Sequence, residues 1–261
     1  MTAPDPILEG TLVTLLGLVL GSFMNVCIYR LPRGLSPVRP RSGCPSCGHM
    51  LAWFENVPVV SYLVLRGRCR RCGTSISLIY PAIELVTGAV FLAGYLWYGP
   101  GLLLVARLAF AWAMIALFAI DLQHKILPNV ITVPGAIVGF LASGVAGPGW
   151  IDSLIGIVVG AGSLFVIAEI YYRVRHEEGL GMGDVKMLGM IGAFLGWKLT
   201  LVTLVLSSFA GSIVGVGILV AKKESLKYAL PFGAFLAAGA LVAAVAGDAL
   251  LDWYLGFFRS P

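Results

Sequence analysis

Long apolar segments restrict most strongly what this chain can fold into. Eight can be delimited: Ile7–Tyr29, Pro81–Tyr98, Leu102–Ile120, Asn129–Ala146, Ile151–Tyr172, Val185–Trp197, Leu199–Ala221 and Ala229–Leu255. Most approach the roughly 20 residues that an α-helix needs to cross a bilayer. Only 12% of the residues are charged, against about 25% in an average soluble domain. The sequence therefore predicts an all-α polytopic membrane protein with about eight transmembrane helices.

The sixth segment, Val185–Trp197, is the shortest of the eight. Gly189, Gly192 and Gly196 interrupt it. Short or broken apolar helices are tolerated at membrane depth where other protein segments surround them. We therefore expect either a half-helix or a segment deep inside the bundle.

The basic residues predict an orientation. With the N-terminus outside, the inner loops hold fifteen of the eighteen Lys and Arg residues: Arg30, Arg33, Arg39, Arg41, Arg66, Arg68, Arg70, Arg71, Lys125, Arg173, Arg175, Lys186, Lys222, Lys223 and Lys227. Loops on the cytoplasmic side carry such an excess. We expect both termini outside. Topology also accounts for the pI near 9.0, which is then only weak evidence for nucleic-acid binding.

Two aspartates lie at the ends of apolar segments that are far apart in sequence. Asp121 follows the third segment and Asp184 precedes the sixth. In the predicted topology both fall at the cytoplasmic face. Acids beside membrane spans are functional-site candidates, and two carboxylates that share one proton can perform general acid–base catalysis. The alternatives are a helix cap for Asp184 and an ordinary interfacial acid for Asp121.

The neighbours of these aspartates suggest supporting roles. Gly181 and Gly183 would let a substrate strand approach the backbone closely. Lys125 and Lys186 either anchor to lipid headgroups or favour ionisation of a nearby carboxylate. Glu84, a few residues inside the second segment, is either a snorkelling or helix-bonded acid or a group that recognises a substrate ammonium.

The polar stretch 30–80 contains two Cys-x-x-Cys pairs. Their members are Cys44, Cys47, Cys69 and Cys72. Thiolate pairs at this spacing bind Zn²⁺ tetrahedrally, and Gly48 and Gly73 follow them as tight turns require. A structural zinc would stabilise a region this small. Four reduced cysteines in a small core, or a redox pair, are the alternatives.

Several motifs in order along the chain resemble the type IV prepilin peptidase family. They are Gly21-Ser22-Phe23-Met24-Asn25-Val26, Cys44-Pro45-x-Cys47-Gly48, Trp53-Phe54-Glu55-Asn56-Val57-Pro58, Cys69-x-x-Cys72-Gly73, Tyr80-Pro81-Ala82-Ile83-Glu84, Asp121 with Leu127-Pro128-Asn129, and Gly181-Met182-Gly183-Asp184-Val185-Lys186. A later segment, Pro231-Phe232-Gly233-Ala234-Phe235-Leu236, resembles the family's Pro-Phe-Gly-Pro-Phe-Leu, with Ala234 in place of a proline. We expect this departure to affect a loop or helix start rather than the chemistry.

The resemblance implies two activities. One removes a basic leader after a glycine from prepilins and pseudopilins of type IV pilus and type II secretion systems, with Asp121 and Asp184 as catalytic residues. The other methylates the new N-terminal amine with S-adenosylmethionine, and in the family it accompanies the cysteine region. Glu84, Glu55 and Asn56 are candidates for contacts with substrate or methyl donor.

The implied organisation has three parts: a first transmembrane helix at 1–29, a cytoplasmic zinc-binding domain at 30–80 and a membrane peptidase core at 81–261. The implied location is the bacterial inner membrane, with lipids and pilin precursors as partners and no nucleic acid. An alternative function is a cation- or proton-coupled transporter with a metal-sensing domain, in which the two acids bind the transported ion.

Overall fold

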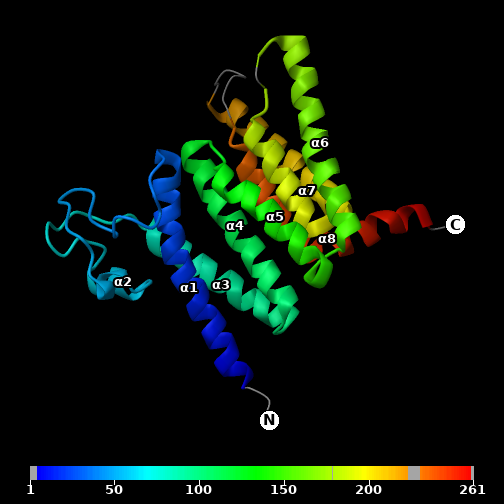
Figure 1. Cartoon of the computed structure of the whole chain (residues 1–261). Helices are drawn as coiled ribbons and strands as arrows, with labels where there is room; N and C mark the ends of the chain where they lie inside the picture. The colour runs from blue at the N-terminus through cyan, green and yellow to red at the C-terminus, as the bar shows by residue number, and fades with distance from the viewer. Residues whose placement is uncertain (1–4, 178, 223–229, 260–261) are drawn as a thin grey trace. The chain divides into compact units, whose positions relative to one another are not determined.

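The computed structural model describes residues 5–177, 179–222 and 230–259, and these form helices joined by loops with no extended strand (Figure 1). Contacts divide the chain into two units, Met1–Leu108 and Ala109–Pro261. Seven helices in the described part are long and apolar enough to cross a membrane. The predicted polytopic all-α fold is confirmed. Of the sequence features above, the start of the last apolar segment, Ala229, and the basic residues Lys223 and Lys227 lie outside the described residues.

The first unit is built on two long helices, α1 (Pro6–Arg30) and α3 (Ile79–Tyr98), which pack along each other. Asp5 caps α1 by accepting a hydrogen bond from the Ile7 backbone N–H at 2.9 Å. A side chain at Gly17 would come within 2.9 Å of the Gly88 Cα, so these glycines permit a close helix crossing. Close packing fixes α1 along the length of α3.

Between α1 and α3 the chain forms short elements only. They are the 3₁₀ turns η1 (Leu31–Arg33) and η2 (Trp53–Asn56) and the helix α2 (Val60–Val64). The remainder consists of loops with two isolated bridges, Gly43 with Met50 and Arg68 with Ser75. We call residues 34–78 the cysteine lobe. With so little regular structure, the lobe depends on other contacts for its shape.

Helix α4 (Leu102–His124) crosses the division between the units. The second unit continues with α5 (Asn129–Ala146), α6 (Trp150–Arg175), α7 (Met182–Lys222) and α8 (Phe232–Arg259). Its core includes the tilted ring pair Phe110–Phe194, with centroids 5.1 Å apart. Five side chains of the first part of α7 are fully buried: Met187, Leu188, Met190, Ile191 and Ala193. This segment lies deep inside the unit, in agreement with the sequence.

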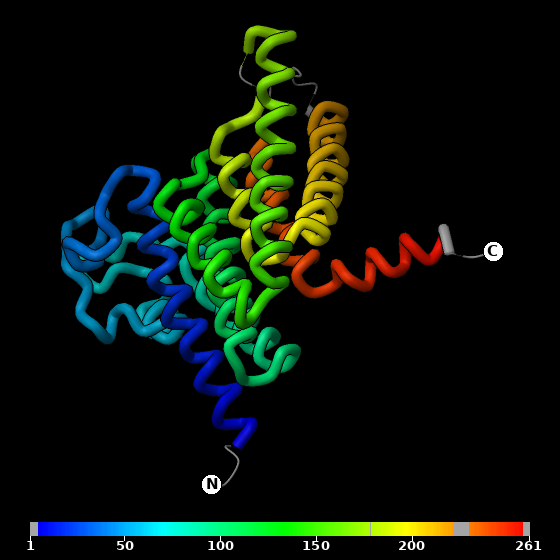
Figure 2. The backbone as a smooth tube through the Cα atoms, turned by 45° about the vertical axis from the view of Figure 1, so that its right-hand side comes forward, coloured from blue at the N-terminus to red at the C-terminus, as the bar shows by residue number. Residues whose placement is uncertain are grey.

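Helix α7 is two helices that meet at Gly196. This glycine has φ 75° and ψ 172°, a backbone conformation that residues with a side chain rarely adopt. A side chain at Gly160 of α6 would meet both the Leu188 carbonyl, before the break, and the Thr200 methyl, after it. The chain therefore folds back at Gly196, and Figure 2 shows the second part returning beside the first. The sixth and seventh predicted segments are thus separate. The sixth, about 14 residues or about 21 Å long, is shorter than a roughly 30 Å hydrocarbon core.

Candidate functional site

Asp121 lies in the last turn of α4 and is 4% exposed. Its Oδ2 accepts a hydrogen bond of 2.8 Å from the backbone N–H of Ala234, in the first turn of α8. A side chain at Gly233 would come within 3.0 Å of the same oxygen. The N-terminus of a helix carries unpaired N–H groups and partial positive charge, both of which favour an anion. The start of α8 therefore forms a binding surface for the Asp121 carboxylate.

Asp184 is the third residue of α7 and is partly exposed. Its backbone N–H donates to the Gly181 carbonyl at 3.1 Å, so Gly181 rather than Asp184 occupies the position that precedes the helix. The Asp184 carboxylate lies within electrostatic range of the Asp121 carboxylate. The fold thus brings together two acids that are 63 positions apart in sequence, one partly open to solvent and one buried.

The loop after α4 connects the surroundings of both acids. A side chain at Gly183 would come within 3.0 Å of the Leu127 Cβ, and one at Gly233 within 2.8 Å of the Leu127 Cδ1. Leu127 thus fills the space beside Gly183 that we expected to accommodate a substrate strand. Beside Gly181 the nearest atom is the Asp184 Oδ2, at 3.4 Å from an added Cβ. An added side chain would therefore make only ordinary contacts at Gly181, whereas at Gly183 it would press against Leu127.

The two lysines differ in their contacts. Lys186 Nζ donates to Asn129 Oδ1 at 3.0 Å and so connects the segment after Asp184 to the start of α5. Lys125 has φ 54°, its N–H donates to the Asp121 carbonyl at 2.8 Å, and its charge acts on the Asp121 carboxylate.

From the sequence, Leu127 and Asn129 were identified only as parts of a motif. Nothing in their side-chain chemistry indicated that they join the two acidic segments.

The cysteine lobe contains two turns of the same construction. In the first, the Cys44 N–H donates to the His49 carbonyl and the Gly48 N–H to the Cys44 carbonyl. The second repeats this pattern with Cys69, Thr74 and Gly73. Gly48 and Gly73 have φ of 67° and 71°, so both predicted glycine turns are confirmed. Each turn presents two sulfurs to the other.

The four sulfurs fit a tetrahedral metal. The distances are 3.8 Å between Cys44 Sγ and Cys72 Sγ and 3.9 Å between Cys47 Sγ and Cys69 Sγ, and all four atoms lie within 4.8 Å of one another. Zn–S bonds of about 2.3 Å in a tetrahedron place sulfurs roughly 3.8 Å apart. The cluster can therefore hold a metal ion with little movement.

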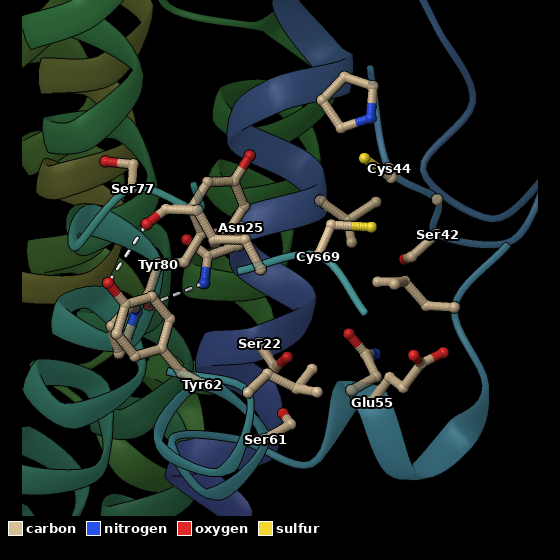
Figure 3. A pocket seen from close by; sticks show the side chains of 18 of the residues that line it. Ser22, Asn25, Ser42, Cys44, Glu55, Ser61, Tyr62, Cys69, Ser77 and Tyr80 are labelled. Atoms are coloured by element: carbon tan, nitrogen blue, oxygen red, sulfur yellow. Dashed lines mark hydrogen bonds between the residues drawn. The ribbon is translucent and has the colours of Figure 1, made fainter. Parts of the chain in front are cut away.

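A cavity of about 280 Å³ opens between the cysteine lobe, α1 and the start of α3 (Figure 3). All three residues predicted to contact substrate or methyl donor line it: Glu55, Asn56 and Glu84. Glu55 and Glu84 are each 8% exposed, whereas Asn56 is exposed. Glu84 Oε2 accepts a hydrogen bond of 2.7 Å from the Val59 N–H, so this acid neither snorkels nor bonds within its own helix. It connects α3 to the start of α2.

Sequence comparisons identify the family. One family model, the bacterial peptidase A24 N-terminal domain, matches residues 15–98, and a second, the type IV leader peptidase family, matches residues 108–216. Three relatives named prepilin leader peptidase/N-methyltransferase come from Myxococcus xanthus (44% identity), Pseudomonas putida (37%) and Aeromonas hydrophila (35%). The alignments cover 79%, 94% and 97% of this chain. They cover 62%, 93% and 96% of the relatives. The chain belongs to the type IV leader peptidase family. No solved structure matches it.

Family membership bears on several predictions. Both models describe peptidases, so the transporter alternative is not supported. The chain is a multi-pass membrane protein. The first model contains the four cysteines and the cavity-lining acids, and the second contains Asp121 and Asp184. Ala234, which donates to Asp121, lies beyond both matched ranges.

Ala234 stands where the family motif has a proline, and the structure places it at the start of α8. We expected its replacement of the proline in the resembling family motif to leave the chemistry untouched. Ala234 does lie at a helix start, but its N–H contacts the Asp121 carboxylate, and a proline has no N–H to donate. The substitution therefore gives Asp121 a hydrogen bond that the motif with proline lacks.

We expect Ala234→Pro to fold normally, because proline is tolerated in the first helical turn and the preceding Gly233 has no Cβ to clash with the ring. Loss of the N–H should remove about 1 kcal/mol or more of hydrogen-bond stabilisation from the ionised Asp121 carboxylate. If Asp121 is the base, cleavage at neutral pH should slow by roughly fivefold. The matched control is Ala234→Gly, which keeps the N–H. Identical pH–rate profiles for the two variants would show that this hydrogen bond does not influence Asp121.

Proposed function

We propose that this chain removes the leader peptide from prepilins and pseudopilins after a glycine and then methylates the new N-terminal residue with S-adenosylmethionine. The observation that carries the peptidase half is that Leu127 packs against both Gly183, next to Asp184, and Gly233, beside the Asp121 carboxylate, so that the two acids act electrostatically on each other. The names of relatives that are 34–37% identical over more than nine-tenths of this chain support both halves.

The two aspartates divide the proton transfers of hydrolysis. Two carboxylates at close range favour sharing one proton, so one is ionised and the other protonated. The ionised acid takes a proton from a water molecule, whose oxygen attacks the glycine carbonyl carbon. The protonated acid donates to the carbonyl oxygen or to the leaving amine as the C–N bond breaks. The Ala234 N–H holds the Asp121 carboxylate in place, and either aspartate can serve as the base.

The cysteine lobe has a separate role in this proposal. Cys44, Cys47, Cys69 and Cys72 hold a structural Zn²⁺, which fixes the two turns and through them the cavity beside α1. S-adenosylmethionine supplies the methyl group. The new N-terminal amine forms a bond to the methyl carbon while the C–S bond breaks with its electron pair on sulfur, and the amine then loses a proton.

We place the protein in the bacterial inner membrane with both termini outside, so that the aspartate pair and the cysteine lobe face the cytoplasm. The asymmetric distribution of Lys and Arg supports this orientation. Membrane lipids and pilin precursors are then its partners. An acidic pair at the cytoplasmic face has the charge to attract the basic leader that the family resemblance implies.

The proposed function is tested with the purified full chain, a prepilin and methyl-labelled S-adenosylmethionine. We expect mass spectrometry to show loss of the leader and gain of one methyl group on the product. An intact precursor would contradict the peptidase half. A cleaved but unmethylated product would contradict the methyltransferase half alone, so the two halves are judged separately.

A further inference from the structure

The cavity beside α1 contains a buried acid with an unused oxygen. The Glu55 side chain is 2% exposed, and its Oε2 accepts hydrogen bonds from the Ala52 N–H at 2.8 Å and from His49 Nε2 at 3.2 Å. Its Oε1 is buried without a hydrogen-bond partner. A buried acceptor left without a donor destabilises the fold, and the penalty is larger for a charged group. Such an atom indicates a ligand that supplies the donor.

Glu55 is held as an anion. The Ala52 N–H, and then His49 and Arg70, keep the pKa of this carboxyl below its ordinary value. Glu84 is a second buried acid in the same cavity, and its Oε2 is already bonded to Val59. A cavity lined by two buried acids favours a ligand with a positive charge and several hydrogen-bond donors.

The opposite side of the cavity is aromatic. Figure 3 shows Glu55 at one side and Tyr62 and Tyr80 at the other, with Asn25 between them. The Asn25 amide and the Tyr62 hydroxyl donate to the Tyr80 and Ile76 carbonyls at 3.0 and 3.2 Å, which fixes both side chains. The Tyr62 ring, which is held in this way, and the Tyr80 ring beside it can stack against a flat heterocycle. The cavity thus combines an anionic end and an aromatic side.

We infer that this cavity is the binding site of the methyl donor, with Glu55 Oε1 accepting a hydrogen bond from a ribose hydroxyl or from the ammonium group. This inference rests on the methyltransferase half of the proposed function. S-adenosylmethionine carries all the matching groups: a flat adenine, two ribose hydroxyls, an ammonium and a positive sulfonium. Arg70 lines the cavity as well, and its positive charge can attract the carboxylate of the methyl donor. The volume, about 280 Å³, is near the lower limit of roughly 300 Å³ for ligand pockets.

The first test measures binding without any peptide. Glu55→Gln keeps the shape of the side chain but removes its charge. We expect the full-length variant to bind labelled S-adenosylmethionine at least about tenfold more weakly than the wild type in equilibrium dialysis. The methylated fraction of cleaved product should fall in parallel. The matched control is Glu169→Gln, which changes an exposed acid paired with Arg173 on α6 and should bind as the wild type does.

A second measurement uses wild-type protein, so it does not depend on whether a variant folds. Wild-type protein is irradiated with labelled S-adenosylmethionine and digested, and the labelled peptides are identified. We expect label on peptides that contain Tyr62 or Tyr80 and its loss when unlabelled S-adenosylhomocysteine competes. Label confined to residues 109–261 would overturn the inference.

The outcomes separate this inference from the proposed function. If wild-type protein methylates its product and Glu55→Gln binds and methylates equally well, the inference fails and the function stands. If Glu55→Gln weakens capture of the peptide but not of S-adenosylmethionine, the cavity receives the substrate amine and the inference again fails. A wild-type protein that neither binds nor uses S-adenosylmethionine would overturn both.

Discussion

Replacing either Asp121 or Asp184 by asparagine should abolish leader cleavage, with a rate loss of about 10²–10⁴-fold or more. Asparagine has nearly the size and shape of aspartate but can neither take up nor release a proton in the required range. Each variant keeps one acid, and one acid cannot act as base and proton donor in the same step. The measurement is the single-turnover rate of leader release from a prepilin by purified protein.

The same variants should keep their fold and their methyltransferase activity. In the proposed organisation, methyl transfer takes place in the first unit, so Asp184→Asn should still methylate a synthetic peptide that begins at the cleaved residue. Asp248→Asn, at an exposed aspartate on α8, is the matched control and should cleave at the wild-type rate. Undiminished cleavage by Asp121→Asn or Asp184→Asn would refute the catalytic pair.

Replacing Cys44 by serine should release the metal from the cysteine lobe. Serine at this position leaves three thiolates in a site that needs four, and structural zinc contributes about 10–16 kcal/mol of apparent binding free energy in small domains. The lobe has no helix longer than the five residues of α2 in its described part, so little else maintains its shape. We expect zinc content to fall from about one per chain to near zero. New proteolytic cleavage should appear within residues 34–78.

Cys27→Ala is the matched control for this experiment. Cys27 is the fifth cysteine, buried in α1 and outside the metal cluster, so its replacement should leave the zinc content unchanged. If the wild-type protein contains no metal and its four thiols react freely, the cysteines do not form a metal site. Full metal content in Cys44→Ser would likewise show that the cysteines do not act together as ligands.

Hydropathy was sufficient to predict the helices, because lipid leaves a chain few alternatives. The first segment was expected at Ile7–Tyr29 and the helix runs over Pro6–Arg30. The cysteine turns were equally predictable, since the Cys-x-x-Cys-Gly pattern specifies both the ligands and the left-handed glycine. The glycine at which the chain breaks, Gly196, could not be singled out from the sequence. Three glycines interrupt that segment, and only tertiary packing determines which of them adopts a positive φ.

The contacts that position the proposed catalytic acid were not predictable from side-chain chemistry. The alanine in place of a proline at position 234 was expected to affect only a loop or helix start, but the Ala234 backbone N–H contacts Asp121. Leu127 is another example, since this side chain fills the space beside two glycines from different motifs. For Glu55 the sequence indicated a candidate. That one of its oxygens is buried without a partner follows only from the way the lobe folds.

The approach of residues 121 and 184 is tested most directly by thiol crosslinking in the membrane. Asp121→Cys and Asp184→Cys are combined in a Cys27→Ala background and treated with a short bifunctional thiol reagent. We predict a crosslink that joins the two peptides and is identified by mass spectrometry. A pair made from Asp184→Cys and Asp248→Cys, far along α8 from the turn that contacts Asp121, should not crosslink. If both cysteines of the first pair react singly but never with each other, the two carboxylates do not meet and the account is contradicted.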